Sequence, residues 1–393
     1  MANPNAYVPI MLQAAAVKTE ATIGLDAFGG SPALSDFVGA EISVRLPQQA
    51  AEDPSVTGSF DTNAPIVTGV QAEITFRFPF RGVATPGTAP EWGKLAKACR
   101  MIETLTASAI GAPTAATAGT ATTVTLPATP FSSVAQAYRG MPAALSGNPA
   151  AGDLSVIDDY TAARVARFPE TFAAPLSTAT LVQILPNALY APTSDLTLLK
   201  PVTIYGYKGG LRHRFVGCQG SFRLEMTAKQ PAMLVFVLKG VILDAYQPVA
   251  LPTGWNTARS QPPAWIGGIS QLDQAKCTCQ RFNFDFGVQS VYPDDPEGAQ
   301  GYDTPQITGA DQRIEIDPYT NTTRSPTRFT KYQAGQAVQY AAMIGSTAGN
   351  RLSLSVPSAI ITSMDEGNRE KLMTDQMQLA TNVPDASVFL AVF

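Results

Sequence analysis

The sequence predicts a mainly β protein, and three features carry this prediction. Apolar and polar residues alternate in several runs, Gly or Pro ends most of these runs, and helical spacing of apolar residues is rare. An alternation of period two is typical of strands that bury one face and expose the other to solvent. The apolar fraction of 45% is sufficient for a core, so an intrinsically disordered chain is excluded.

Residues 73–80 show the clearest strand pattern. Ile74 and Phe78 fall on one face, whereas Glu73 and Arg77 fall on the other. The same alternation recurs at residues 222–226, 281–286 and 351–356. We therefore expect antiparallel strands with one buried face in both halves of the chain.

Residues 202–207 and 211–216 predict a strand pair, because Lys208, Gly209 and Gly210 form a turn sequence between them. The run that follows at 232–238 is apolar at every position. An antiparallel strand with one solvated face should alternate, so both faces of this segment should be covered. A second sheet of the same chain could cover the second face, and so could another subunit, which the low charge of the chain slightly favours.

Helical signals are confined to two segments. In residues 90–102, Pro90 suits a first-turn position, and Trp92 and Leu95 fall on one face. A second, shorter helix is expected near residues 328–333. The chain is therefore predicted to contain one short helix in each half.

Changes in composition divide the chain. Residues 107–121 are rich in Ala, Thr and Gly and are predicted to be a linker. A small independent β-domain is expected after it, from short strands at residues 123–126, 141–145, 154–157, 164–168 and 180–184. A Pro-, Gly- and Ser-rich stretch at residues 248–268 precedes a C-terminal β region. The order of strands and helix before this stretch resembles the order after it, which suggests the hypothesis that the two halves are structural copies.

The charge balance limits the possible partners. Charged residues make up 15% of the chain, and 27 Lys and Arg against 31 Asp and Glu leave a net charge of −4. So little surface charge favours assembly, and no basic excess exists to drive nucleic-acid binding by counterion release. The first residues lack the basic stretch of a secretory signal, and no apolar run has the length of a membrane span. We therefore expect assembly in the cytosol, without a membrane partner.

The candidate chemical groups do not form a recognisable site. His213, the one His of the chain, lies between Arg212 and Arg214, without a sequence signal for a nucleophile or an orienting carboxylate. Cys277 and Cys279 have CxC spacing rather than the CxxC spacing of metal and redox sites, so a buried thiol pair is favoured.

Four residue doublets complete the candidates: Asp294-Asp295, Asp365-Glu366, Gly209-Gly210 and Gly267-Gly268. The acidic doublets could bind a cation or act as an acid and base, but one loop doublet is little context for such a site, and solvated loops are favoured. The glycine doublets lack the surrounding pattern of a phosphate-binding loop. We therefore predict no catalytic, cofactor-binding or metal-binding residues, no cofactor, and no enzymatic activity.

The hairpin region carries a resemblance to a known family. Residues 209–226 read GGLRHRFVGCQGSFRLEM, and residues 231–240 read PAMLVFVLKG. These motifs resemble the hairpin signature of major tail tube proteins from long-tailed, siphovirus-type bacteriophages, and residues 80–99 are similar to the strand, loop and helix of those proteins. The resemblance covers most of residues 40–105 and 187–393, and its motifs are structural rather than catalytic.

The resemblance implies a fold of tandem tail-tube-like β-sandwich or barrel domains, each with a short helix. The first domain would be discontinuous, comprising residues 1–110 and 187–250, and the second would comprise residues 260–393. Residues 118–186 depart from a minimal tube protein and would form a small inserted β-domain on the exterior of the tube.

The resemblance also implies a structural virion protein. Six tube domains would close a ring, and stacked rings would form the tail tube through which DNA leaves the capsid. With two domains per chain, a homotrimeric, pseudo-hexameric ring is favoured, and a homohexamer is the alternative. Long loops at residues 288–305 and 364–382 would bridge stacked rings. The implied partners are further copies of the chain, the tail terminator, tape measure and distal tail proteins, and genomic DNA in transient, non-specific passage.

A tail decoration protein or a receptor- or carbohydrate-binding β-protein is the alternative function. Such a protein would need aromatic side chains exposed in loops, and Trp255 and Trp265 could serve. Both lie in the 248–268 stretch, where packing between domains is the favoured interpretation.

Overall fold

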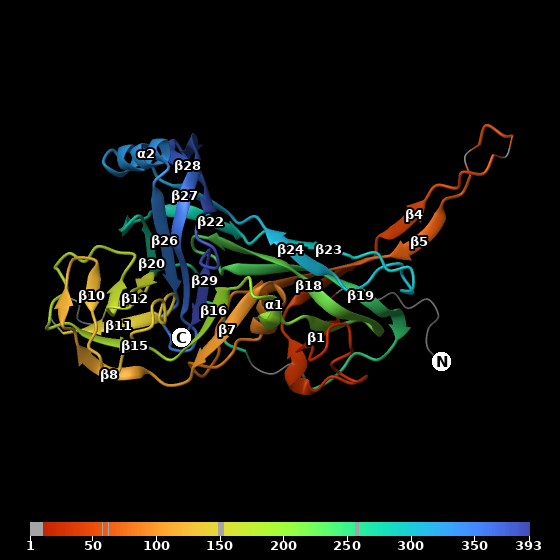
Figure 1. The fold of residues 1–393 in the computed structure, drawn as a ribbon, viewed down its shortest axis with the longest axis horizontal. Helices are drawn as coiled ribbons and strands as arrows, with labels where there is room; N and C mark the ends of the chain where they lie inside the picture. Colours follow the sequence, from red (N-terminus) through yellow and green to blue (C-terminus); the bar gives the residue numbers. More distant parts are fainter. Residues whose placement is uncertain (1–10, 57, 62, 148–152, 256–258) are drawn as a thin grey trace.

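The computed structural model describes residues 11–56, 58–61, 63–147, 153–255 and 259–393. Three predicted segments lie partly outside the described residues: the first domain at residues 1–10, the inserted domain at residues 148–152, and the 248–268 stretch at residues 256–258. The molecule is elongated and built mostly of strands (Figure 1). The described residues contain α1 (Gly93–Ala98), α2 (Arg324–Ala334) and the short 3-10 turns η1 (Leu34–Asp36) and η2 (Leu196–Leu198). The prediction of a mainly β fold with a short helix in each half is confirmed.

One continuous hydrogen-bonded ladder runs through both halves of the molecule, and we call it the long ladder. Its strands pair antiparallel in the order β3, β6, β19, β18, β22, β25, β28 and β27. Their bounds are β3 (Glu41–Arg45), β6 (Ala72–Pro79), β18 (Leu211–Thr227), β19 (Met233–Pro248), β22 (Cys279–Asp285), β25 (Arg313–Pro318), β27 (Leu352–Arg369) and β28 (Leu372–Thr381). Because side chains alternate along each strand, the ladder has one apolar face and one polar face.

A second layer covers the apolar face. In one part of it, β2 (Phe37–Val38), β1 (Gln13–Thr19) and β17 (Val202–Lys208) pair in this order with the N-terminal part of β18. In the other part, the order is β7 (Met101–Thr106), β16 (Asn187–Pro192), β29 (Phe389–Val392), the N-terminal part of β27, β26 (Ala337–Ile344), β20 (Ile269–Leu272) and β21 (Ala275–Lys276). Buried side chains of both layers form one core, in which Phe76 and Phe236 of the ladder join Val17 and Ile204.

The second half repeats the strand pairing of the first half at a constant spacing. The β3–β6 pairing ends with Arg45 opposite Glu73, and the β22–β25 pairing ends with Asp285 opposite Arg313. Each residue of the second pair lies 240 positions after its counterpart in the first pair. The two strand pairs therefore occupy the same place in two similar arrangements.

The hairpins that connect these strands match in the same way. β4 (Gln48–Ala51) pairs with β5 (Ile66–Val70), and β23 (Val288–Val291) pairs with β24 (Gln306–Ala310). The register shifts after Gln49 in the first hairpin and after Gln289 in the second, again 240 positions apart. The other matching elements follow in the same chain order: β1 and β20, β2 and β21, α1 and α2, β17 and β26, and the hairpins β18–β19 and β27–β28.

Two strand pairs join the halves into one body. Residues 223–227 of β18 pair with residues 281–285 of β22, and β16 pairs with β29. At the first junction Leu224 lies opposite Phe284, and both side chains are fully buried. The apolar core is therefore continuous across the boundary between the halves.

A small β module lies beside the second layer. In one sheet β12 (Asp153–Val156), β11 (Pro142–Ser146), β15 (Leu181–Ile184) and β8 (Ile110–Ala115) pair in this order, and in the other β13 (Asp159–Tyr160), β14 (Val165–Arg167), β10 (Thr123–Thr125) and β9 (Ala118–Gly119) do so. The core of the module includes Leu189 and Phe389 of the main body. Strands occur at all five predicted positions. The prediction of a linker at 107–121 is wrong, because β8 and β9 lie there and pair with β15 and β10.

The helix predicted at residues 90–102 is shorter in the structure. Arg100 adopts a φ of 65°, which is incompatible with a continuing helix, and from Met101 the chain runs as β7. Trp92 and Leu95 are buried, as their spacing predicts. The C-terminal end of the predicted helix is therefore a strand, because pairing with β16 replaces the helical hydrogen bonds.

Three further predictions differ from the structure. α2 is longer than the predicted 328–333 segment and ends at Ala334, where Gly335 with a φ of 59° forms a left-handed cap. The predicted loop at 364–382 is wrong, because most of it belongs to β27 and β28 and their hairpin turn. Of the loop predicted at 288–305, residues 288–291 form β23. Polar residues on both faces of the β27–β28 tip hide the alternation that marks the other strands.

β18 is one strand rather than the two predicted, and it changes layer near Gly217. Its N-terminal part pairs with β17, and its C-terminal part pairs with β22. Gly217 has a φ of 61°, and its N–H donates to the buried Glu20 carboxylate over 2.7 Å. The Thr203 hydroxyl donates to the same oxygen over 2.8 Å, so this carboxylate holds the bend of β18 against β17.

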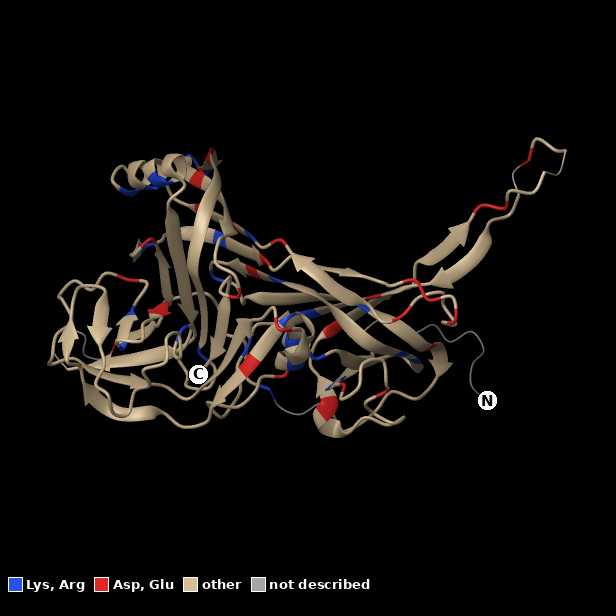
Figure 2. Cartoon of the chain, viewed as in Figure 1, with Lys and Arg blue, Asp and Glu red and all other residues tan. Residues whose placement is uncertain are grey.

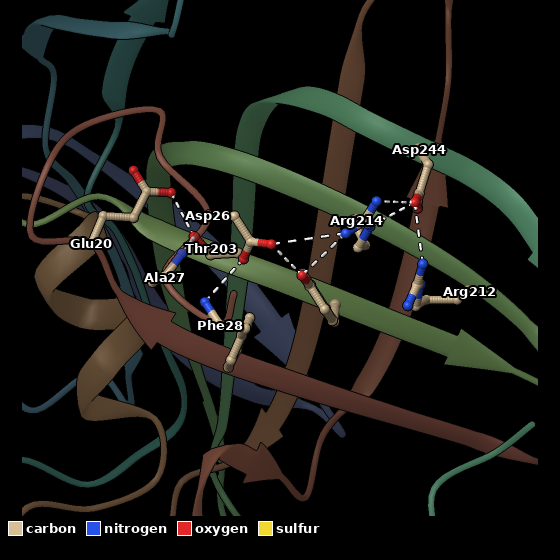
Figure 3. A network of polar contacts seen from close by, with 9 residues as sticks. Glu20, Asp26, Ala27, Phe28, Thr203, Arg212, Arg214 and Asp244 are labelled. Atoms are coloured by element: carbon tan, nitrogen blue, oxygen red, sulfur yellow. Dashed lines mark hydrogen bonds and ion pairs between the residues drawn. The ribbon is translucent and has the colours of Figure 1, made fainter. Parts of the chain in front are cut away.

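A polar network extends from this bend along the second layer (Figure 3). The Tyr205 hydroxyl donates to Asp26 in the loop after β1. Asp244 of β19 accepts hydrogen bonds from Arg214 Nε over 2.6 Å and from Arg212 over 3.2 Å. These contacts attach the loop after β1 to the β17–β18–β19 strands and fix where β18 crosses between the layers.

Gly217→Ala should destabilise the fold, because the added Cβ would lie 2.6 Å from Thr304 Cγ2 and the φ of 61° disfavours a side chain. We expect a loss of ~1–3 kcal/mol in the free energy of unfolding, measured by denaturant titration. Gly309→Ala is the control, because its Cβ would have only one neighbour within 4 Å, at 3.9 Å. Equal stability of the two variants would contradict the importance of this bend.

Candidate functional site

The polar face of the long ladder carries an ordered array of charged side chains. Its residues alternate with the buried ones, so that Glu73 of β6 lies beside Lys239 of β19, and Arg223 of β18 lies beside Asp285 of β22. On this face the ladder strands carry seven basic and seven acidic residues: Arg45, Arg77, Arg223, Lys239, Arg281, Arg313 and Arg369, with Glu41, Glu73, Glu225, Asp285, Glu315, Asp317 and Asp365. Figure 2 shows the two signs interspersed along the strands.

Each arginine of the polar face is paired with a carboxylate. The pairs are Arg45 with Glu73 (3.2 Å), Arg77 with Glu225 (3.9 Å), Arg223 with Glu225 (2.8 Å), Arg281 with Glu315 (3.9 Å), Arg313 with Asp311 (2.7 Å) and Arg369 with Asp317. Exposed pairs of this kind contribute little to stability. Their chemical effect is to neutralise the guanidinium groups locally, so the face presents no unopposed positive patch.

A groove crosses this face near its β27 end. Its lining includes Arg281, Glu315, Asp317, Asp365 and Arg369. The groove combines both signs of charge, like the face as a whole. It therefore offers a polar, charge-balanced surface rather than the mostly apolar pocket that is typical of a small-molecule site.

The long ladder ends in two strands with a free edge. Among the described residues, β3 pairs in the ladder with β6 alone, and residues 363–369 of β27 pair with β28 alone. In the single chain the Ile42 N–H of β3 donates to the Gln13 side-chain carbonyl over 3.2 Å, so a strand that pairs here would replace this contact. A strand edge that lacks a partner presents backbone N–H and C=O groups able to pair with another chain. The two edges are the counterparts of β22 and β18, which pair with each other inside the chain.

The structure places His213 among aromatic rings. Its ring lies 4.6 Å from the Tyr246 ring and 6.4 Å from the Phe215 ring, between centroids. Burial lowers the pKa of His213, which favours the neutral imidazole. Asp244, the acidic group with an influence on it, is bound to Arg212 and Arg214. The surroundings are those of a packed strand residue.

The two cysteines of the CxC motif lie against the core. Cys277 is buried and Cys279, at the start of β22, is half-buried. The hydrogen bond with Cys277 and burial both raise the pKa of Cys279, which opposes formation of a thiolate. No group of three or more His, Cys, Asp or Glu able to hold a metal ion occurs in the residues that the structure describes.

The residue doublets have structural positions. Asp295 accepts the backbone N–H of Glu297 over 3.0 Å in a surface loop. Asp365 and Glu366 are adjacent on β27 and therefore point to opposite faces, so they do not form an acid–base pair. Gly209-Gly210 forms the turn between β17 and β18. In the Gly267-Gly268 doublet, a Cβ added at Gly268 would collide with the Met343 carbonyl.

The two tryptophans of the alternative function do not form an exposed aromatic platform. Trp265 is buried, and Trp255 packs on Phe37 with 5.8 Å between ring centroids. Packing therefore accounts for both rings.

Sequence analysis did not identify the free edges or the hairpin arm of β4 and β5. The arm projects from the body in Figure 1, and Val56 and Phe60 near its tip are fully exposed. In the sequence, only the aromatic residue Phe60, between the strand-like segments 41–45 and 66–79, could have suggested the arm. The edges depend on long-range pairing, which leaves no local signal in the sequence.

Comparison with known proteins agrees with this architecture. Within the described residues, no helix combines the length and the apolar character required to cross a membrane. No curated protein matches the chain. A family model described as phage tail tube protein matches residues 12–375, nearly the whole length. The chain therefore belongs to the phage tail tube protein family, whose members are components of the virion tail.

Proposed function

We propose that three copies of this chain close into a ring, that rings stack into the tail tube, and that the tube conducts the genome from the capsid to the host cell. The observation that carries this proposal is the long ladder, which joins two strand sets of similar design and ends in free edges at β3 and β27. Pairing of these edges between copies would satisfy their backbone groups and close the ladder by cyclic symmetry.

The stoichiometry follows from the proposed domain division. Residues 1–110 with 187–250 form one tube-like domain, and residues 260–393 form the second, so three chains supply six domains. The constant spacing of 240 positions between matched strand pairs supports this division. A ring of six chains would contain twelve domains of this design and a correspondingly wider channel.

The polar face of the long ladder lines the proposed channel. DNA binds protein surfaces through unopposed basic groups that displace counterions from phosphates. Here each arginine of the face is held by a carboxylate, and the two signs are balanced. Such a surface is hydrated and has no net charge, so a passing DNA duplex meets no basic patch that binds its phosphates.

The inserted domain, residues 118–186, lies on the tube exterior in this arrangement. It belongs to the module whose core includes Leu189 of β16 and Phe389 of β29, both in the second layer. That layer covers the apolar face of the ladder, opposite the polar face. A module attached there points away from the channel and leaves the channel width unchanged.

The β4–β5 arm provides a contact between stacked rings. Val56 and Phe60 near its tip are exposed, and Ile66 and Val67 on β5 are about half exposed. Apolar groups on a projecting hairpin are unfavourable in water and are covered when the arm docks on another subunit. The base of the arm is fixed to the body, because Gln300 accepts the Val70 N–H over 3.1 Å.

The remaining parts of the proposal follow from a tube of this kind. The chain is a structural protein rather than an enzyme and needs no cofactor. It assembles in the host cytoplasm, and its tube ends contact the tail terminator, the tape measure and the distal tail proteins. No sequence-specific contact with DNA is involved.

The mass of a single ring tests the stoichiometry. Native mass spectrometry of rings released from assembled tubes should give three times the 41.5 kDa chain mass. Electron microscopy of the same preparation should show open-ended tubes with a central hole. Six chains per ring would contradict the tandem arrangement, and a stable monomer without tubes would contradict the proposed function.

Removal of acids from the polar face should create DNA binding. In the triple variant Glu225→Gln, Glu315→Gln and Asp317→Asn, several arginines lose their carboxylate partners. We expect salt-sensitive binding of duplex DNA, measured by fluorescence anisotropy, where the unmodified protein shows none. The control has the same charge change elsewhere: Glu52→Gln, Asp153→Asn and Glu297→Gln. Equal binding by both triple variants would show that net charge, not this face, controls the interaction.

Phe60→Ser should weaken stacking without affecting ring closure. We expect shorter tubes in micrographs and a larger fraction of free rings in analytical ultracentrifugation, because the arm loses an apolar contact. Val134→Ser is the matched control, since Val134 is an exposed apolar residue of the inserted module. Tubes of normal length from Phe60→Ser would exclude the arm as a stacking contact.

A further inference from the structure

We propose that residues 365–369 of β27 pair antiparallel with residues 41–45 of β3 in a neighbouring copy, with Asp365 opposite Arg45 and Arg369 opposite Glu41. This inference rests on the proposed ring and adds to it the register of the contact between chains. The register follows from the junction that the chain already contains, from the matched strands of its two halves, and from the charges at the two free edges.

The internal junction is the template. β18 pairs antiparallel with β22, from Arg223 opposite Asp285 to Thr227 opposite Arg281. If the halves are equivalent positions in one ring, the edge of β27 meets β3 of the next copy as β18 meets β22. The register then depends only on which residues of β3 and β27 correspond to those of β22 and β18.

β3 corresponds to β22 with an offset of 240. The β3–β6 and β22–β25 pairings end at Arg45 and Asp285, and the hairpins that follow have a bulge at the same relative position. A backbone contact repeats as well, because the Gln71 N–H donates to the Pro47 carbonyl and the Asp311 N–H donates to the Gly287 carbonyl. Residues 281–285 therefore correspond to residues 41–45.

The correspondence of β18 and β27 follows through the neighbouring strands. Pro79 of β6 pairs with Met233, which pairs with Glu225 of β18. Tyr319 lies 240 positions after Pro79, bridges to Thr374, and Thr374 pairs with Gly367 of β27. Glu225 therefore corresponds to Gly367, and residues 223–227 correspond to residues 365–369.

A bulge gives the same answer independently. Val202 and Ile204 are two positions apart on β17, but their partners on β18 are three positions apart, so β18 has one extra residue just before Cys218. β27 does the same opposite Val338 and Tyr340 of β26, up to Ala359. β27 then has one extra residue between 361 and 363 in its pairing with β28, which moves the offset from 141 to 142. An offset of 142 again places 223–227 on 365–369.

The charges at the two edges favour this register over its neighbours. In the proposed register Asp365 faces Arg45 and Arg369 faces Glu41, so both pairs have opposite charge, as Arg223 and Asp285 do at the internal junction. A shift of two residues in either direction would remove both of these pairs, because Asp365 would then face Ser43 or Pro47 and Arg369 would face Gly39 or Ser43. A shift of four residues would place Asp365 opposite Glu41 in one direction and Arg369 opposite Arg45 in the other. A shift of one residue would turn apolar side chains to the polar face.

The apolar side of the contact also matches the template. At the internal junction Phe222 and Phe286 are buried, with 5.0 Å between ring centroids. Their counterparts are Met364 and Leu46, which lie at the margin of the core and are half-buried in the single chain. The proposed register brings these two side chains together and completes their burial.

Cysteine cross-linking tests the register. In tubes assembled from the Asp365→Cys, Arg45→Cys double variant, oxidation should link chains in high yield, because ladder partners have Cα separations of about 4.5–5.5 Å, within disulfide range. The matched control is Asp365→Cys with Ser43→Cys, which should give little product because the pair is displaced by two residues. The two Asp365→Cys and Arg45→Cys single variants measure the background from the native cysteines. A higher yield from the control, or tubes with no product from either pair, would overturn the register.

Charge reversal tests the same contact without cross-linking. Asp365→Arg should reduce ring formation severalfold, and adding Arg45→Asp should restore it, as measured by size-exclusion chromatography with light scattering. Failure of the double reversal to restore rings would count against the pairing of these two residues. The unmodified protein separates the two proposals: rings with the wrong register refute only this inference, whereas the absence of rings refutes the proposed function and this inference together.

Discussion

The constraint on which this structure depends is the need of every backbone N–H and C=O group for a hydrogen-bond partner. A sheet meets this need for its inner strands but not for the two outermost ones. In this chain β18 pairs with β22, so both are inner strands of the long ladder. The outermost strands are β3 and the C-terminal part of β27. The polar face, the core and the placement of the inserted module are all organised around that ladder.

The internal junction shows how this constraint is met between two strand sets. Leu224 and Phe284 are fully buried there, whereas Val44 and Met364 at the outer edges are only partly buried. The same design therefore occurs in one complete and two incomplete forms within a single chain. The incompletely buried edges and the small number of charged residues both favour an assembled chain over a separate monomer in water.

Local patterns were sufficient to predict most of the fold. The period-two runs at 73–80 and 281–286 are strands, and all five short strands of the inserted module occur where their residues indicated. The errors have a common physical origin. Arg100 ends α1 through its backbone conformation, and the β27–β28 tip is polar on both faces, so in neither case do apolar residues report the structure. Pairing with strands distant in the sequence determines the structure of these segments.

The absence of a predicted active site had a different basis. The sequence around His213, Cys277 and Cys279 supplies no second group for chemistry, and the structure places these residues among packed side chains. The polar face could not be recognised from sequence, because its residues come from strands up to some three hundred positions apart in the chain. Only the alternation in each strand hinted that such a face exists.

The covalent connection between the two strand sets has a further thermodynamic consequence. A junction made within one chain forms at a high effective concentration and loses no translational or rotational freedom of a separate molecule. In the proposed ring two positions are fused into each polypeptide, so half of the contacts around the ring would form during folding rather than by encounter of separate chains. Nucleation of such a ring would require fewer simultaneous collisions, and assembly would begin at a lower intracellular concentration than an unfused subunit of the same affinity would need.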